Sequence, residues 1–302
     1  ASDGTLTWNK SLNTSGDWIG LAVATDSSDN IYVTGRTDHQ SNSGNPNPFV
    51  VKLNSSGAVQ WAKKYDHGGQ QSQAVGIALD SNGDIFVSGS IHEQITGGGY
   101  SSGMVMKLSG TDGSIIWQKF FDDEESSNGY HSDQFQNCVV TPEGDVLTCG
   151  WVNKNYQGTY YGVVLKLSGT DGSVVWQRYT NNTDGTKKIA VDSAGKIYTF
   201  GDNEVLFVYA SDGTLEQEWN ITGASNPGTK AFYFEDIFID HKDNAVLTGF
   251  WYPSGANYAN GFVVKLPATI QAGTSGDFVI TAQSLGDSAG ELNSTTSVSY
   301  TH

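Results

Sequence analysis

The stretch KLSGTDGSVVW at Lys166–Trp176 recurs almost unchanged as KLSGTDGSIIW at Lys107–Trp117, so the chain contains internal repeats. Each copy combines an apolar segment, a Gly-containing reversal and a second apolar segment that ends in Trp, which is the pattern of a β-hairpin. A more degenerate copy, FVVKLNSSGAVQW, occupies Phe49–Trp61. Repetition of this kind indicates one continuous repeat architecture instead of several unrelated domains.

A second type of hairpin precedes each of these copies. GLAVATDSSDNIYVTG at Gly20–Gly35 is an apolar strand, an Asp-started turn and an alternating strand that ends in Gly. The closing glycine of this hairpin recurs at positions 35, 89, 150, 201 and 249, while the loops between the hairpins vary in length. Two hairpins make a unit of four strands, and we predict an all-β fold, a five-bladed β-propeller of four-stranded blades.

The predicted propeller covers residues 1–267, and its fifth blade lacks an outer strand. The fifth unit stops at FVVKLP, Phe262–Pro267, whereas SDGTLTW at Ser2–Trp8 resembles SDGTLEQEW at Ser211–Trp219. We therefore predict that Gly4 to Trp8 supplies the fourth strand of blade five and closes the ring, which removes two exposed edges. The predicted blades are residues 17–65, 72–121, 133–180, 186–221 and 232–267 plus 2–9.

Residues 268–302 are rich in Ser, Thr and Gly and contain one strand-like piece, FVITAQSL at Phe278–Leu285. This composition is typical of a tail or a connector, and we predict that the segment lies outside the blades.

Composition narrows the classes of partner. The 302 residues carry a formal net charge of -16, which disfavours nucleic acid and anionic lipid, because both attract a basic face. No apolar run approaches the ~20 residues of a membrane-spanning helix, so we expect no membrane insertion. Cys138 and Cys149 fall in neighbouring predicted strands, and their pairing is left open. No motif suggests a cofactor or a metal.

Two residue types recur once per unit, and we interpret both as structural. Asp at the first turn can accept hydrogen bonds from the backbone two residues on, and Thr141 takes the same place in the third unit. One large aromatic residue per outer strand is suited to packing adjacent sheets together. The structural residues predicted in this way are Asp26, Asp80, Asp192, Asp240, Trp8, Trp61, Trp117, Trp176 and Trp219.

The long loops are expected on one face of the propeller, opposite the short turns. Their aromatic and small polar residues are typical of carbohydrate-binding and protein-binding surfaces, although such residues also pack locally. The candidate ligand-binding residues on this face are Trp18, His67, Tyr100, His131, Tyr160, Tyr161, Trp251, Tyr252 and Tyr258.

Acidic residues on the same face leave an enzyme hypothesis open. Asp17, Asp133, Asp184 and Asp236 lie near the starts of the inner strands, where a glycoside hydrolase would place its acid and its base or nucleophile. The inner strands themselves carry no acid at mid-strand, which disfavours hydrolysis. The run Asp122 to Glu125 offers oxygen ligands for calcium but lacks the spacing of an EF-hand, and we interpret it as a solvated loop.

The repeats resemble bacterial β-propeller repeats of the SBBP type. The residues that carry this resemblance are AVATDSSDNIYVTG, GIALDSNGDIFVSG and FVVKLNSSGAVQW, and the KLSGTDGSxxW variant also resembles quinoprotein-type repeats. Such a resemblance implies the propeller fold and is weak for function. These families commonly have more than five blades. The whole chain, with its ending KLPATIQAGTSGDFVITAQSLGD, is similar to virion structural proteins of marine tailed phages, which implies a tail, fibre or capsid appendage.

These observations favour a non-enzymatic structural or adhesive propeller in a virion or at an extracellular surface. Its expected partners are other structural subunits of an assembly and, through the loop face, a cell-surface glycan. A lectin-like carbohydrate-binding module is the first alternative, and a five-bladed glycoside hydrolase is the second.

Overall fold

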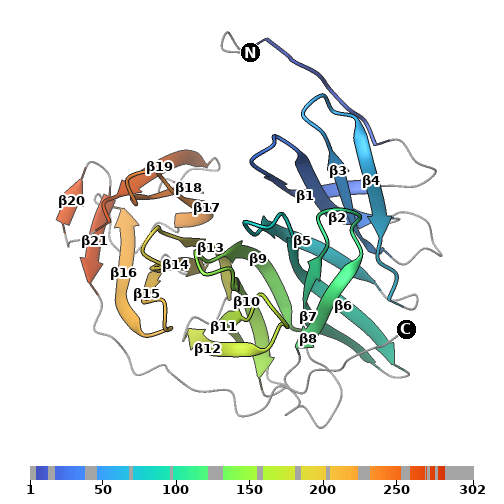
Figure 1. Cartoon of the computed structure of the whole chain (residues 1–302). Helices are drawn as coiled ribbons and strands as arrows, with labels where there is room; N and C mark the ends of the chain where they lie inside the picture. The colour runs from blue at the N-terminus through green and yellow to red at the C-terminus, as the bar shows by residue number, and fades with distance from the viewer. Residues whose placement is uncertain are drawn as a thin grey trace. The chain divides into compact units, whose positions relative to one another are not determined.

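The computed structural model gives the chain an all-β fold, the five-bladed β-propeller (Figure 1). The structure describes residues 5–12, 18–37, 46–67, 71–95, 98–121, 132–154, 159–180, 185–201, 205–223, 232–252, 259–268, 270, 273–275 and 278–282. No helix occurs within these ranges. The chain divides into two compact units between Cys138 and Val139, and each unit is described by itself.

The first unit contains two four-stranded antiparallel sheets in which neighbours in sequence are neighbours in space. The first sheet consists of β1 (Trp18–Thr25), β2 (Ile31–Thr37), β3 (Pro48–Leu53) and β4 (Val59–Lys64). The second consists of β5 (Ser72–Leu79), β6 (Ile85–Ile95), β7 (Gly98–Leu108) and β8 (Ile115–Phe121).

The remaining sheets follow the same order. The third consists of β9 (Gln134–Val140), β10 (Val146–Lys154), β11 (Thr159–Leu167) and β12 (Val174–Thr180). The fourth begins with β13 (Thr186–Val191), β14 (Ile197–Gly201), β15 (Val205–Tyr209) and β16 (Leu215–Gly223). The fifth consists of β17 (Phe232–Ile239), β18 (Ala245–Trp251) and β19 (Asn260–Leu266). Five sheets in this order confirm the five predicted blades.

The closing glycines are required because the backbone of the first strand comes very close to the second strand. A bulge interrupts the register of β5 between Ala74 and Gly76 and that of β17 between Phe234 and Asp236. At this point a Cβ atom on Gly89 would lie 2.0 Å from the carbonyl oxygen of Gln73, which no side chain can tolerate. The repeated glycine therefore marks the bulge of the inner hairpin in the first, second, fourth and fifth sheets.

Apolar faces of consecutive blades form the core within each unit. Val50 of the first sheet packs with Ala74, Ile85 and Met106 of the second in one buried cluster. In the second unit a larger cluster joins Phe200 and Leu206 of the fourth sheet to Phe234, Leu247 and Leu266 of the fifth. Strands β3, β14 and β15 are buried along almost their whole length, as expected for strands covered on both faces.

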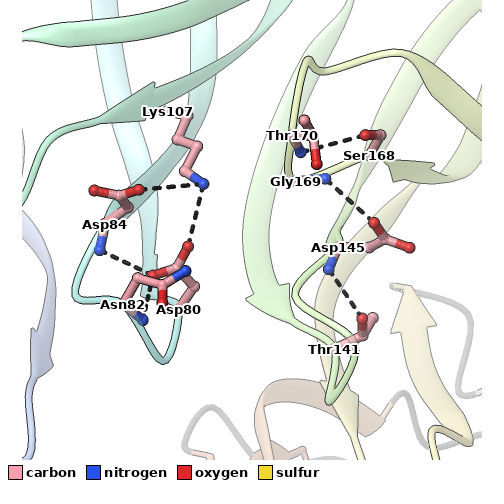
Figure 2. Close-up of polar contacts among 9 residues, drawn as sticks. All are labelled: Asp80, Asn82, Asp84, Lys107, Thr141, Asp145, Ser168, Gly169 and Thr170. Carbon is pink, nitrogen blue, oxygen red and sulfur yellow. Dashed lines mark hydrogen bonds and ion pairs between the residues drawn. The ribbon is translucent and has the colours of Figure 1, made fainter.

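The Asp residues of the first turns organise those turns through hydrogen bonds (Figure 2). The carboxylate of Asp80 accepts hydrogen bonds from the amides of Asn82 and Asp84, both at 2.9 Å, and it lies 3.2 Å from Nζ of Lys107 on β7. In the third sheet the hydroxyl of Thr141 accepts from the amide of Asp145 at 3.2 Å. These contacts account for the recurrence of Asp, and for a hydroxyl in its place, without any catalytic role.

The Trp residues of the outer strands cover a glycine in the β3–β4-type hairpin of the following blade. The ring of Trp61 on β4 lies over Gly113, and the ring of Trp176 on β12 lies over Gly213. Nε1 of Trp176 also donates a hydrogen bond to the carbonyl oxygen of Ser211 at 3.2 Å. Within each unit, these indole rings therefore join consecutive blades.

The structure corrects the predicted strand at Gly4 to Trp8. Residues 5–12 form no strand, and the fifth sheet has three strands within the described residues. The segment is held by a side chain instead of a strand ladder: Nε1 of Trp8 donates to the carbonyl oxygen of Ser55 at 3.0 Å, and the indole ring covers Gly57.

The structure also corrects the prediction that residues 268–302 lie outside the blades. Two strands in this segment, β20 (Gly273–Ser275) and β21 (Phe278–Ala282), extend the fourth sheet to six strands in the order β13-β14-β15-β16-β21-β20. Strand β21 pairs antiparallel with β16, and the residue opposite Trp219 is Ala282. The strand-like pattern of FVITA was correctly recognised, but its pairing with the edge of β16 was not predicted.

Candidate ligand-binding surface

Antiparallel pairing separates the short turns of each sheet from its long connections. The turns after the first and third strands lie at one end of the sheet, here the turn end, and the connection after the second strand lies at the other, the loop end. Much of the long connections lies outside the described residues, and the candidate surface is therefore built from the strand termini that border them.

Three aromatic rings gather at the loop end of the fifth sheet, where they form a cluster that we call the Tyr252 cluster: Tyr233, Phe250 and Tyr252. The rings of Tyr233 and Phe250 are stacked, with centroids 5.0 Å apart and planes at 18°. Tyr252 meets both rings edge-on, at 6.1 Å from Tyr233 and 5.8 Å from Phe250. The side chain of Tyr252 is 44% exposed, so the cluster offers aromatic surface to solvent.

Strand register explains why these rings meet. Tyr233 on β17 lies directly opposite Phe250 on β18, and cross-strand aromatic pairs are among the more stabilising pairs in sheets. Tyr252 follows Phe250 by two residues, so the alternation of side chains brings it to the same face of the sheet. Trp251, which lies between them, falls on the opposite face and is half-buried.

The side chains of Thr248 and Asp236 can form hydrogen bonds, and the strand register places these two residues near the cluster. Thr248 precedes Phe250 by two residues on β18, and Asp236 of β17 lies opposite Thr248. The side chain of Asp236 is 65% exposed, and its carboxylate lies 3.8 Å from Nζ of Lys188 on β13. The bulge between Phe234 and Asp236 locally redirects the strand at this point, as bulges near binding sites do.

Aromatic rings beside a carboxylate and a hydroxyl can bind a sugar. Rings cover the apolar C–H face of a pyranose, and the polar groups hydrogen-bond to its hydroxyls. Phe250 is absent from the residues predicted on the loop face. Its place opposite Tyr233 follows only from the register.

Two of the predicted residues contact the cores of their blades. Trp18 lies 4.6 Å from Phe49, between ring centroids, and packs against the buried group of Phe49, Val51 and Leu53. His67 meets Phe120 edge-on at 5.5 Å and is half-buried. These contacts place both side chains in packing and not in a surface cluster.

The third sheet contributes two tyrosines at its loop end. Tyr160 is 36% exposed, and Tyr161 meets Tyr179 edge-on with centroids 6.5 Å apart. Both belong to β11, and Tyr160 is the more accessible of the two. His131 and Tyr258 lie outside the described residues, and Tyr100 is described only as part of the β7 backbone.

Few of the acids considered for catalysis fall in the described part of the chain. Asp133 is buried, and its amide donates to the carbonyl oxygen of Ser101 at 2.8 Å. Asp236 is exposed beside Lys188. The described residues do not include Asp17, Asp184 or the run from Asp122 to Glu125.

The described residues offer little other chemistry. No group of three or more His, Cys, Asp or Glu side chains among them is placed to hold a metal ion. Cys138 and Cys149 are buried and form no disulfide. Burial raises the pKa of the Cys138 thiol to about 12, and its Sγ donates to the carbonyl oxygen of Phe86 at 3.7 Å, so the thiol is protonated at neutral pH. In the same ranges, no helix has the length and apolarity needed to cross a membrane.

Comparison with known proteins supports the repeat and the fold. The family model described as the SBBP β-propeller repeat matches residues 15–41, which cover the first inner hairpin. No curated protein matches the chain. The match extends over a small part of the chain, so it shows a propeller repeat of this kind and does not assign a function.

Several solved structures are similar in fold at low sequence identity. A protein of unknown function from Dyadobacter fermentans has a TM-score of 0.52 at 10% identity, over 80% of this chain and 74% of that one. The Dos1 propeller has a TM-score of 0.50 at 15% identity, over 90% of this chain and 69% of that one. A glucose dehydrogenase reaches a TM-score of 0.47 at 10% identity, over 83% of each chain. At these identities the likeness concerns the fold alone.

Proposed function

We propose that the chain is a non-enzymatic structural and adhesive propeller in a virion or extracellular assembly, which binds a cell-surface glycan or a partner through its loop end. The observation that carries the proposal is the Tyr252 cluster, three aromatic rings with Tyr252 partly exposed, in which the strand register places Thr248 and Asp236 next along the sheet from Phe250 and Tyr233. The assembly part of the proposal rests on the resemblance of the sequence to virion structural proteins of marine tailed phages, which the comparisons with known proteins do not show.

Rigidity supports the adhesive role. The blades are fixed by buried apolar clusters and by indole rings that cover the hairpin of the next blade, so binding groups at the strand ends are held in place before a ligand arrives. A preorganised surface loses less entropy on binding, which suits weak ligands bound by many copies on one particle.

A glycan array tests the proposal with the isolated protein, Tyr252→Ala and the matched control Phe238→Ala. We expect bound glycans for the wild-type protein and for Phe238→Ala, because Phe238 is an exposed aromatic residue of the same blade that lies at its turn end. The Tyr252→Ala variant should lose about tenfold in affinity, the effect of truncating an aromatic contact worth ~1–2 kcal/mol. Equal binding by both variants would remove the Tyr252 cluster from the proposal.

Two alternatives predict different results. A silent array, together with stable incorporation of the protein into particles, favours a purely structural role. A glycoside hydrolase remains the enzymatic alternative, because Asp236 neighbours the aromatic cluster in the register. Release of sugar from a substrate that is abolished by Asp236→Ala or Asp133→Ala would overturn the non-enzymatic proposal.

A further inference from the structure

The outer edge of the fourth sheet differs from the other outer edges in sequence. The outer strands β4, β8 and β12 each carry a basic residue two positions after their Trp, namely Lys63, Lys119 and Arg178. Strand β16 carries Ile221 at this position. Charged residues on outer strands discourage the pairing of another strand. The charged residues of β16, Glu216 and Glu218, precede the stretch Trp219–Gly223, which contains none and therefore accepts a strand more readily.

In β12 the basic residue, Arg178, contacts the next blade. Nε of Arg178 donates to the carbonyl oxygen of Gly213 at 2.8 Å, and its guanidinium lies 5.7 Å from the centre of the Trp176 ring. The fifth blade ends its third strand at Leu266, directly before Pro267, and the described residues contain no fourth strand after it. Among the described residues, the fifth blade therefore has no hairpin after its third strand. A basic residue at position 221 would have no hairpin carbonyl there to which it could donate a hydrogen bond.

The hairpin of β20 and β21 pairs with the outer edge of β16, the strand that carries Ile221 where other outer strands carry a basic residue. Strands β20 and β21 pair with each other, and β21 pairs with β16 over five residues, with Ile221 opposite Ile280. Ile221 is fully buried and shares an apolar cluster with Trp219, Leu266 and Ile270. The edge is therefore a built acceptor site for one strand of alternating pattern.

The covalent path from β16 to β21 is indirect. The whole fifth blade lies between Gly223 at the end of β16 and Phe278 at the start of β21. A short connection that begins with Pro267 joins β19 to the hairpin. A strand ladder formed by a terminal hairpin on a short connection can be formed equally well with a hairpin from another molecule, and exchange of this kind is a low-cost route to oligomers.

We propose that β16 is a strand-acceptor site through which copies of the chain are linked, with the hairpin of residues 273–282 of one copy bound to β16 of a second copy. The hairpin of a second copy fits this site because it has the same sequence and can pair with β16 in the same register. Exchange competes with pairing inside one chain and is favoured where copies are concentrated, as on a particle. The proposal deepens the assembly part of the proposed function by naming a second copy as the partner, and it does not depend on glycan binding.

Cross-linking of cysteine variants tests the proposal. Asn220 lies opposite Thr281 in the register, so Asn220→Cys in one copy and Thr281→Cys in another become neighbours only when the hairpin has exchanged. The two variants are mixed at high concentration, taken together through mild denaturation and refolding, and treated with a short bis-maleimide. We expect a covalent heterodimer, and we expect none from the wild-type protein, whose two cysteines are buried.

Two controls make either result decisive. The double variant Asn220→Cys/Thr281→Cys, treated when dilute, should be cross-linked within one chain, which verifies the register. Ile280→Lys in the Thr281→Cys copy leaves the acceptor intact and should reduce the heterodimer at least tenfold. Intramolecular cross-linking without any heterodimer from the mixture would overturn the proposal, and so would a double variant that is not cross-linked at all. Either result leaves the glycan array unaffected, so this proposal and the proposed function can fail separately.

Discussion

At the scale of single residues, the contact between Trp and Gly is the feature that joins consecutive blades. Gly213 has a φ of +82°, in the left-handed region, and a Cβ atom placed on it would lie 2.7 Å from Cδ2 of Trp176. Gly83 has almost the same φ, +83°, but no atom of the described residues lies within 4 Å of its added Cβ. Substitution of Gly83 therefore introduces backbone strain alone, whereas substitution of Gly213 introduces backbone strain and also displaces the indole ring.

We predict that Gly213→Ala destabilises the protein more than Gly83→Ala. The control should lose about 1–2 kcal/mol because a non-glycine residue is strained at positive φ. Gly213→Ala should lose a further ~1–3 kcal/mol because the methyl group displaces the ring of Trp176. Urea unfolding of the two variants and the wild-type protein measures the difference. Equal losses would mean that the ring yields without cost and that the contact does not stabilise the blades.

The sequence allowed some of these residue roles to be predicted and not others. Recurrence at one position per unit was enough to interpret Asp80 and Trp176 as structural, because any repeat needs its turns and its packing between blades. The Tyr252 cluster was found in part, since Tyr252 lies in a long loop of the sequence. Phe250 was missed because its role depends on the residue opposite it, and register is not a property of one strand.

At the scale of elements, an ion pair connects the first turn of the fifth blade to its third strand. Lys265 on β19 donates to the carboxylate of Asp240, which also accepts from the side-chain amide of Asn244 at 2.9 Å. The hydrogen bond from Lys265, with further hydrogen bonds from Asn244, lowers the pKa of Asp240 below its ordinary value of 3.8. The ionised carboxylate is therefore favoured in the folded protein.

This shift predicts how stability depends on pH. A carboxyl group whose pKa is lower in the folded than in the unfolded state contributes stability above its unfolded pKa and loses that contribution as pH falls. The free energy of unfolding of wild type minus that of Asp240→Asn should be positive at pH 6 and should shrink as pH falls below about 4. Lys265→Met should show the same change with pH, as urea unfolding at several pH values measures. A difference that stays constant with pH would contradict this role of the ion pair.

Hairpins are the elements that the sequence predicted best. Lys107–Trp117 and Lys166–Trp176 contain the turns of the β7–β8 and β11–β12 hairpins, because their two strands and their reversal are local in sequence. The pairing of β21 with β16 was not predicted, since an alternating apolar strand fits many edges. Only comparison of the outer strands, with Ile221 where the others carry Lys or Arg, distinguishes the edge that it uses.

At the scale of the whole molecule, residues 5–12 contact the first blade with the same kind of side-chain contact that an outer strand makes with the next blade, although they form no strand. Trp8 contacts Ser55 and Gly57 as Trp176 contacts Ser211 and Gly213, with an Nε1 hydrogen bond to the serine carbonyl in both cases. Lys10 also follows Trp8 by two residues, as Arg178 follows Trp176. The side-chain contacts of an outer strand are therefore present at this position.

Removal of residues 1–9 should show what this segment contributes. The truncation uncovers the β3–β4 hairpin, because the indole over Gly57 and the hydrogen bond to Ser55 are lost. We expect the apparent melting temperature to fall by several degrees, which corresponds to a loss of ~1–2 kcal/mol, and we expect concentration-dependent association through uncovered apolar surface.

Trp8→Leu should reproduce the loss of stability in part, whereas Leu6→Ser should change nothing, since Leu6 is 75% exposed. Thermal melting and sedimentation of the three variants provide the measurement. A truncated protein that stays monomeric and melts like the wild type would show that Trp8 rests on the first blade without stabilising it.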